Sequence, residues 1–301
     1  MRIFVAGATG YIGSAVVHAL LDEGHAVTGL ARSDASAAAL TRIGVEVHRG
    51  DIDDIDSLRT AAAASDGVIY AANKHISETT DPAARAQVEL NAVEAIGAQL
   101  EGTGKSFVVT SGVIGRTPGR LLTEETPNAA NPVTALRLRA ETAVLALAER
   151  GVRSSSVRLA PTVHGYGDAR GFISILIGIA QDKGISAFVG DGSNRWPAVH
   201  RLDAATLFRL AVESAPAGTA LHAVAEEGVP FRDIAEAIGR QLGLPAVSLT
   251  TEQADQHFGF LAPLVGIDNP ASSAQTRERF GWLPKEPTLI ADIEEGHYFK
   301  H

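Results

Sequence analysis

Three glycines near the N-terminus constrain this chain more than any other feature. Gly7, Gly10 and Gly13 follow a short β-branched and aromatic run, Arg2 to Ala6, and open a segment whose apolar residues have helical spacing up to Gly24. Between a strand and a helix, the first glycine permits a tight turn, the second lets the backbone approach a pyrophosphate, and the third allows close strand–helix packing. The helix N-terminus then faces the phosphates. The spacing therefore predicts a dinucleotide-binding turn, with a purely structural turn as the alternative.

The rest of the N-terminal half alternates between short apolar runs and amphipathic segments. The apolar runs predict strands at 26–31, 45–48, 67–71, 106–110 and 152–159, and the amphipathic segments predict helices at 35–43, 54–64, 81–100 and 131–150. Such alternation builds parallel βαβ units with helices on both faces of one sheet. We therefore expect an α/β fold: a Rossmann-type doubly wound parallel sheet over 1–160, to which some later segments return, and a smaller lobe, mainly substrate-binding, over 161–301.

Composition argues against several function classes. The chain of 301 residues has no cysteine, which excludes disulfides, iron–sulfur clusters and cysteine nucleophiles. A formal net charge of -9 argues against a nucleic-acid-binding surface, and the longest apolar run, 172–180, is too short to span a membrane. The ten histidines show no paired ligand spacing, so we expect no metal. A strand at the very start leaves no room for a signal peptide, and we expect a cytoplasmic location.

The end of the second predicted strand bears on the choice of dinucleotide. Proteins that prefer NAD place an acidic residue there, about 20 residues beyond the glycines, to hold the ribose 2′-hydroxyl. This chain has Ala31, Arg32 and Ser33 instead, and an arginine suits a 2′-phosphate. Asp34 lies past the strand and is expected to cap the next helix. The cofactor prediction is therefore NADP(H), with a solvated surface charge as the alternative for Arg32.

Further motifs follow at matching points of the βαβ series. They are Gly7-Ala-Thr-Gly-Tyr-Ile-Gly13, Gly50-Asp-Ile52, Ala71-Ala72, Thr110-Ser-Gly112, Arg158-Leu-Ala-Pro-Thr-Val-His-Gly165 and Phe280-Gly-Trp-Leu-Pro284. Together they resemble, over nearly the whole chain, the extended branch of the short-chain dehydrogenase/reductase superfamily, which comprises NAD(P)-dependent epimerases, dehydratases and reductases. The resemblance implies a small-molecule substrate and pairing into a homodimer through the two helices beside the central strands. It also implies cofactor contacts from Thr9, Tyr11, Ile12, Asp51, Ile52, Ala71, Ala72, Thr110, Pro161 and Val163.

The catalytic pair of that superfamily is absent here. It is a Tyr-x-x-x-Lys pair on the helix after the fifth strand: the tyrosine exchanges a proton with the substrate oxygen, and the lysine lowers the tyrosine's pKa and holds the nicotinamide ribose. The matching positions are Val133 and Arg137, and 131–150 contains neither tyrosine nor lysine. Arg137 can still donate to the ribose, whereas Val133 cannot transfer a proton. Ser111 matches the residue that polarises the substrate carbonyl.

Another group must then supply the proton in any reductase. Tyr166 closely follows Val163-His-Gly165 and is one candidate. His75 and His164 are others, because histidine titrates near neutral pH. Structural packing is the alternative for each of them.

Substrate ligands are expected in the polar and aromatic segment 190–200, besides His75 and His164. Arg195 is suited to a carboxylate or phosphate, Trp196 to an apolar wall and His200 to a hydrogen bond. Packing within the lobe is again the alternative. Asp203 is expected to cap a helix that begins at Ala204 rather than to act as a base.

Two hypotheses of function follow. The first is an NADP-dependent oxidoreductase, most simply a carbonyl reductase in which Ser111 polarises the carbonyl. Epimerisation or dehydration of a sugar nucleotide is a related alternative that depends more heavily on the missing tyrosine. The second is a non-catalytic NADP(H)-binding sensor or regulator, and fold analogy alone does not decide between them.

Overall fold

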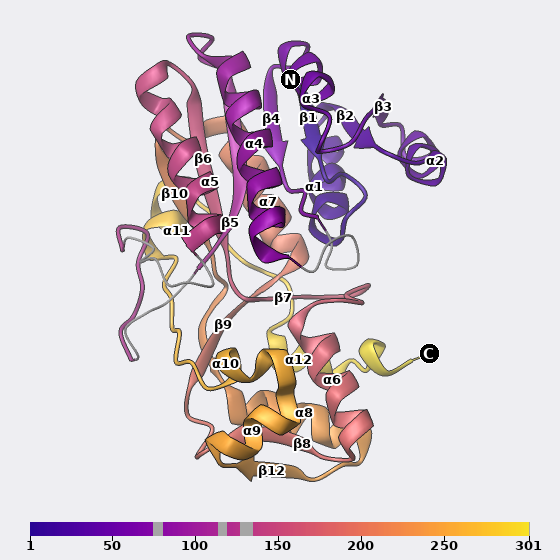
Figure 1. The fold of residues 1–301 in the computed structure, drawn as a ribbon, viewed down its shortest axis with the longest axis vertical. Coiled ribbons are helices and arrows are strands. Elements are labelled where there is room, and N and C mark those ends of the chain that lie inside the picture. Colours follow the sequence, from indigo (N-terminus) through magenta and orange to yellow (C-terminus); the bar gives the residue numbers. More distant parts are fainter. Residues whose placement is uncertain (75–80, 114–118, 127–134, 301) are drawn as a thin grey trace.

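The computed structural model describes residues 1–74, 81–113, 119–126 and 135–300 of the chain. Its larger half is a seven-stranded sheet in the order β10-β6-β5-β4-β1-β2-β3, in which every pair is parallel (Figure 1). The strands are β1 (Arg2–Ala6), β2 (Ala26–Ala31), β3 (Glu46–Arg49), β4 (Gly67–Tyr70), β5 (Ser106–Gly112), β6 (Arg153–Leu159) and β10 (Thr219–Ala223). The strand order reverses between β1 and β4, the switch point where such sheets bind ligands. The predicted Rossmann-type sheet is confirmed.

Helices cover both faces of the sheet, because the strands send apolar side chains to both sides. In β1, Ile3 and Val5 belong to the apolar core on one face of the sheet, whereas Phe4 belongs to the core on the other face. The first face carries α1 (Tyr11–Asp22), α2 (Asp34–Arg42) and α7 (Arg201–Ser214), and the second carries α3 (Ile55–Ala63), α4 (Pro82–Leu100), α5 (Ala135–Ala146) and the short 3-10 turn Leu147–Arg150.

A smaller lobe, at the lower end of Figure 1, has its own apolar core. It contains the three-stranded sheet of β7 (Thr162–His164), β9 (Arg195–His200) and β11 (Glu226–Pro230), and the pair β8 (Ser186–Val189) and β12 (Ala246–Leu249). Its helices are α6 (Phe172–Lys183), α8 (Phe231–Leu242), α9 (Thr251–Phe258), α10 (Ala262–Val265) and α12 (Leu289–Glu294).

The apolar run 172–180 forms most of α6. It buries Ile173, Leu176 and Ile177 in the core of the lobe. Among the helices that the structure describes, none combines the length and the apolar character needed to span a bilayer.

Segments after residue 200 return to the large sheet. Helix α7 covers one face, and β10 pairs with β6 at the edge. After α11 (Ala274–Phe280), Trp282 inserts into the core on the α1 and α7 side, where it is 1% exposed and donates from Nε1 to the carbonyl of Asp203 at 2.9 Å. The C-terminal tail therefore fastens onto the sheet through a large buried ring.

The expected capping role of Asp203 is wrong. Helix α7 begins at Arg201, and His200 is its N-cap, because His200 Nδ1 accepts from the backbone N–H of Leu202 at 3.3 Å. Asp203 lies within the first turn, and its carboxylate accepts from the backbone N–H groups of Lys285 and Glu286 instead.

Replacing Trp282 should destabilise the protein. We expect Trp282→Ala to lower the free energy of unfolding by about 3–5 kcal/mol, because it leaves a large cavity and removes the hydrogen bond to Asp203. The matched control is Leu283→Ala, since the neighbouring Leu283 is 76% exposed. Urea unfolding of both variants measures the difference, and equal losses would contradict this account of the tail.

Candidate functional site

The glycine turn, residues 7–13, lies at the carboxyl end of β1 and touches the end of β4. Gly7 has a φ of +90°, a conformation that favours glycine. A Cβ on Gly7 would lie 2.7 Å from the carbonyl carbon of Ala71 and 2.8 Å from the nitrogen of Ala72, and one on Gly13 would lie 2.0 Å from the Gly7 carbonyl oxygen. No side chain fits at these distances. The structure thus brings together the turn, Ala71 and Ala72.

Helix α1 starts directly from this turn. Its N-cap is Gly10, which offers no side chain to the first N–H groups, and the first turn, which includes Tyr11, Ile12 and Gly13, contains no acidic residue. The first backbone N–H groups of a helix have no partner within the helix, and together with the helix dipole they attract anions. Thr9 and Gly10 are exposed beside them. These residues fit the pyrophosphate of a dinucleotide.

The carboxyl end of β2 is neutral on the strand and basic just beyond it. Ala31 is buried, and Arg32 is exposed. The structure corrects the expected role of Asp34, because Ser33 is the N-cap of α2: its side chain accepts from the backbone N–H of Ser36 at 3.2 Å. Asp34 lies one residue later, where its carboxylate pairs with Arg49 at 2.6 Å.

The loops after β3 and β4 are joined by an ion pair. Asp51 and Ile52 are half-buried, and Ile52 packs on the core of the second sheet face. Lys74, just beyond Ala71 and Ala72, pairs with the carboxylate of Asp53. Sequence reasoning missed Lys74, because only the fold brings these two loops together.

Thr110 and Ser111 lie at the carboxyl end of β5, just before its last residue, Gly112, and both are half-buried. The hydroxyl of Thr110 is buried and has no hydrogen-bond partner among the described residues. Ser111 pairs in register with Arg158 of β6, so the two side chains leave the same face of the sheet. The surroundings of Ser111 are therefore shaped by Arg158.

Arg158 is buried, and its guanidinium connects three parts of the chain. Its Nε lies 2.7 Å from the Glu141 carboxylate of α5, and its Nη1 donates to the carbonyl groups of Glu124 and Thr126 at 3.1 and 3.4 Å. A buried charge pair with satisfied hydrogen bonds fixes geometry more reliably than it adds stability. Arg158 served only as a motif position in the sequence analysis, although a charge inside an apolar strand is itself a signal.

Two expected site residues and one motif position lie, wholly or in their side chain, outside the part of the chain that the structure describes. His75 and Val133 lie outside the described residues. Arg137 belongs to α5, but its side chain is not among the parts of the chain that the structure describes.

His164 lies in a buried polar cluster between the two halves of the molecule. Its Nδ1 is 2.9 Å from the carboxylate of Asp292, which also accepts from His297 at 2.9 Å and from the Tyr298 hydroxyl at 3.1 Å. Burial alone would raise the pKa of Asp292, yet the donors His164 and His297 hold that pKa below its ordinary value. His164 is fully buried. Its ring therefore serves this cluster rather than an open cleft.

The same cluster includes one arrangement that resembles a set of metal ligands. Asp292, Glu295 and His297 place ligand atoms within 4.8 Å of one another. Both oxygens of Asp292 already accept hydrogen bonds, and the contact between Asp292 and His297 is one of them.

Tyr11 connects the glycine turn to this cluster. Its hydroxyl donates to the Gly165 carbonyl at 2.9 Å, and the Gly165 N–H donates to the Tyr298 hydroxyl at 3.0 Å. The Arg201 guanidinium lies 4.5 Å from the centre of the Tyr11 ring and donates to the carbonyl of Tyr166. Burial, together with nearby Asp168, raises the pKa of Tyr11, so its hydroxyl stays protonated and donates. The turn and the lobe are thereby held in one arrangement.

Tyr166 and His200 border this contact. Tyr166 is 78% exposed, and its ring lies 5.8 Å from that of His297. Its described contacts are thus with His297 and Arg201 and do not include Ser111. His200 is buried, edge-to-face with His164 at 5.3 Å.

Arg195 and Trp196 are used within the lobe. Arg195 makes a two-point ion pair with Asp268, at 3.0 and 2.8 Å. Trp196 is 3% exposed and packs edge-on against Phe231 at 4.9 Å. A ring buried this deeply offers no wall to a ligand, which contradicts the expectation for Trp196.

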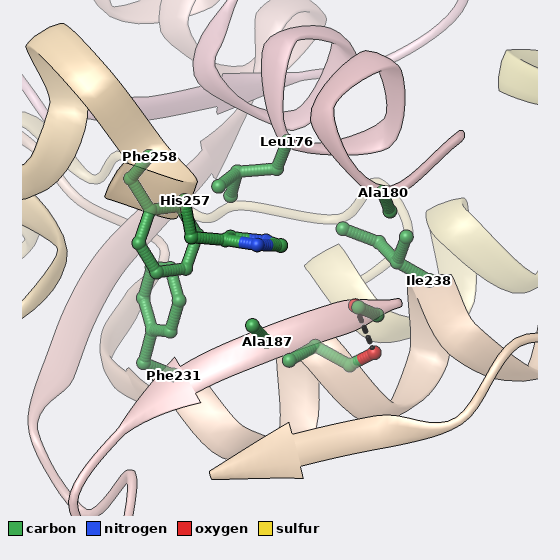
Figure 2. Close-up of a pocket in the computed structure, with 9 residues that line it drawn as sticks. Leu176, Ala180, Ala187, Phe231, Ile238, His257 and Phe258 are labelled. Atoms are coloured by element: carbon green, nitrogen blue, oxygen red, sulfur yellow. Dashed lines mark hydrogen bonds between the residues drawn. The ribbon is translucent and has the colours of Figure 1, made fainter. Parts of the chain in front are cut away.

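The lobe also encloses a small apolar cavity, into which the His257 ring points (Figure 2). Its lining includes Leu176, Ala180, Ala187, Phe231, Ile238, His257 and Phe258. Its volume of about 10 Å³ is enough for roughly one water molecule. It is too small for a substrate, and its lining comes from the lobe rather than from the edge of the sheet.

The sheet order, the glycine turn and the uncapped α1 N-terminus define a nucleotide-binding Rossmann fold, and comparison with known proteins gives the family. Residues 3–224 match the NAD dependent epimerase/dehydratase family. An uncharacterized protein of Schizosaccharomyces pombe is 44% identical over 300 residues, which cover 99% of this chain and 100% of that one. The UDP-glucose 4-epimerase of Corynebacterium glutamicum is 24% identical over 331 residues, or 99% of this chain and 95% of that one.

A solved structure shows the same fold. DesIV, a dTDP-glucose 4,6-dehydratase from Streptomyces venezuelae with NAD and TYD bound, aligns with a TM-score of 0.78 at 19% identity, over 99% of this chain and 96% of that one. The chain belongs to the NAD dependent epimerase/dehydratase family. The resemblance drawn from the motifs is confirmed.

The buried His200 should make stability depend on pH. Burial, and next the neighbouring His164, lower the pKa of His200 below its ordinary 6.5, so the unfolded chain binds a proton more readily. The stability held by the neutral ring is complete above about pH 6.5 and is lost as the pH falls, by at most about 1.4 kcal/mol per pH unit. His200→Asn keeps a capping side chain but cannot titrate. We expect the unfolding free energy of His200→Asn to decrease less from pH 7 to pH 5 than that of the wild type. An equal decrease in the two proteins would contradict this role of His200.

Proposed function

We propose that the protein is an NADP-dependent oxidoreductase that reduces the carbonyl group of a small molecule. The observation that carries the proposal is the glycine turn at the switch point of the sheet, where α1 begins without a side-chain cap or an acidic residue. Ser111 ends β5 at the same edge. An anion site and a hydroxyl donor are thus held on one rigid scaffold, as a hydride-transferring enzyme requires.

The cofactor class follows from the family and the turn. A nicotinamide dinucleotide is the cofactor that the family's name states, and the relative DesIV was solved with NAD bound. The choice of NADP(H) rests on Ala31, where an NAD-preferring protein would have an acidic residue, and on the exposed Arg32 beyond it. We assign the adenine side to Asp51 and Ile52, and the nicotinamide side to Thr110, Pro161 and Val163.

The chemistry assigned to the site is carbonyl reduction. The reduced nicotinamide, when bound, supplies a hydride to the carbonyl carbon. Ser111 donates a hydrogen bond to the carbonyl oxygen, which stabilises the charge that develops there. The oxygen then takes a proton from Tyr166 or from water, and an alcohol results. Arg137 holds the nicotinamide ribose in place of the family's lysine.

Val133 supports a second candidate function. Without a tyrosine at that position the usual proton donor is missing, and a positioned acid typically contributes about 10²–10⁴-fold in rate. A non-catalytic NADP(H)-binding sensor needs no such donor. Epimerisation or dehydration of a sugar nucleotide, as the names of the relatives suggest, depends on the tyrosine even more and ranks below reduction.

A homodimer stays a prediction. The exposed residues of α4 include Gln87, Asn91 and Glu94, and Gln87 donates to Asn91 at 2.7 Å. A dimer interface formed by these residues of α4 would therefore be polar.

Ser111→Ala separates the two candidate functions. With an aldehyde or ketone that the wild type reduces, we expect kcat to fall about 10²-fold, because a hydrogen bond to the developing oxyanion is lost. The affinity for NADPH should stay within about twofold, since Ser111 faces the substrate. NADPH consumption and nicotinamide fluorescence measure the two quantities.

The matched control is Ser106→Ala at the other end of β5. Ser106 is buried, and its hydroxyl has no partner among the described residues, so its removal should leave turnover unchanged. If Ser111→Ala also leaves turnover unchanged, the role of Ser111 is refuted. If the wild type binds NADPH but consumes it with no carbonyl compound, the sensor is favoured.

A further inference from the structure

A second arginine ends β3, the strand next to β2, after which Arg32 follows. Arg49 is the last residue of β3, and it pairs in register with Ala31, the last residue of β2. Neighbouring strands are about 4.8 Å apart, so the backbone of Arg49 lies beside that of Ala31, and Arg32 is the next residue of the chain. The backbone also joins here, because the Gly50 N–H donates to the Ala31 carbonyl at 3.2 Å. Figure 1 shows β2, β3 and α2 together at this edge.

Arg49 is held by an acidic residue of α2. Its Nη2 lies 2.6 Å from the Asp34 carboxylate, and the side chains of Arg49 and Asp34 are 51% and 99% exposed. Ion pairs this exposed add little stability and are screened by salt, so the pair can be exchanged for a stronger partner at small cost. A phosphate monoester is such a partner, because it carries a charge of about −1.5 to −2 and accepts paired hydrogen bonds from a guanidinium.

We propose that Arg49 is a second ligand for the 2′-phosphate of NADP(H), and that Asp34 occupies Arg49 until the phosphate replaces it. This inference rests on the proposed use of NADP(H) and adds the residues that set the preference. Arg49 and Arg32 would then supply two guanidinium groups to one phosphate. Asp34 would compete with that phosphate for Arg49 and so weaken the binding of NADP(H).

The position of Asp34 also admits the opposite role. A carboxylate near the end of β2 is the group that holds the ribose 2′-hydroxyl in NAD-preferring proteins. Two observations favour the competitor role: Asp34 lies in the first turn of α2, beyond the capping Ser33, and its carboxylate is turned to Arg49. The two roles predict opposite effects when the carboxylate is removed.

The experiment is calorimetric titration of the full chain with NADPH and with NADH. For Arg49→Gln we expect NADPH to bind about 10–100-fold more weakly, the effect of losing a hydrogen bond to a charged group, with NADH within twofold of the wild type. For Asp34→Asn we expect NADPH to bind about 2–5-fold more tightly, with NADH unchanged. Arg32→Asp should weaken NADPH and reduce or reverse the preference.

The matched controls are Arg240→Gln and Glu294→Gln. They break another exposed ion pair, 2.8 Å long and 55% and 48% exposed, which joins α8 to α12 in the lobe. Neither change should alter the binding of either nucleotide. Circular dichroism establishes that each variant is folded.

Distinct results overturn the inference and the proposed cofactor. If the wild type prefers NADPH but Arg49→Gln weakens both nucleotides equally or neither, the role of Arg49 is refuted and the proposed cofactor stands. If Asp34→Asn weakens NADH instead of strengthening NADPH, Asp34 is a ribose ligand and the competitor role is refuted. If the wild type binds NADH at least as tightly as NADPH, the proposed cofactor itself fails, and the phosphate site with it.

Discussion

The contact between the glycine turn and the end of β4 is the constraint on which the rest of the site depends. Because Gly7 and Gly13 carry no side chains, the backbone of the turn lies directly against Ala71 and Ala72, and α1 begins at the strand end. Its uncapped N–H groups thus face the switch point of the sheet. Tyr11, in the same turn, contacts the lobe through the Gly165 carbonyl and lies against Arg201 of α7. A single local geometry therefore positions the anion site and joins it to the lobe.

A different interaction organises the carboxyl end of β5 and β6. Arg158 lies beside Ser111 and binds Glu141 of α5 and two carbonyl groups of the segment 124–126. Removing either partner of a buried pair leaves an uncompensated charge, so this network holds α5 against β6. The family's tyrosine and lysine belong to that helix region, where this chain has Val133 and Arg137. The surroundings of Ser111 are thus fixed, while this chain has valine where the family has its tyrosine. The proposed reductase and the alternative sensor differ in whether another group replaces that tyrosine.

Short-range patterns predicted the sheet, the glycine turn and most helices, because strand alternation, helical spacing and glycine turns are written in neighbouring residues. Contacts between distant residues were not predictable in this way: His164 and Asp292 are 128 positions apart, and only the fold places them together. The sequence also did not distinguish between two adjacent candidates for the N-cap of α2, which is Ser33 rather than Asp34. The sequence suggested Trp196 as an apolar wall for a ligand, but its ring is buried in the core of the lobe.

The most direct measurement compares the NADPH affinity of Gly13→Ala with that of Gly178→Ala. Nicotinamide fluorescence reports the binding. Both glycines lie in helices, but a Cβ at Gly178 meets nothing within 4 Å, whereas one at Gly13 meets the Gly7 carbonyl oxygen. The account predicts that the wild type and Gly178→Ala bind NADPH alike, and that Gly13→Ala, still folded by circular dichroism, binds at least about 100-fold more weakly because the turn can no longer close on the pyrophosphate. Wild-type affinity in a folded Gly13→Ala, or no nucleotide binding by the wild type, would contradict it.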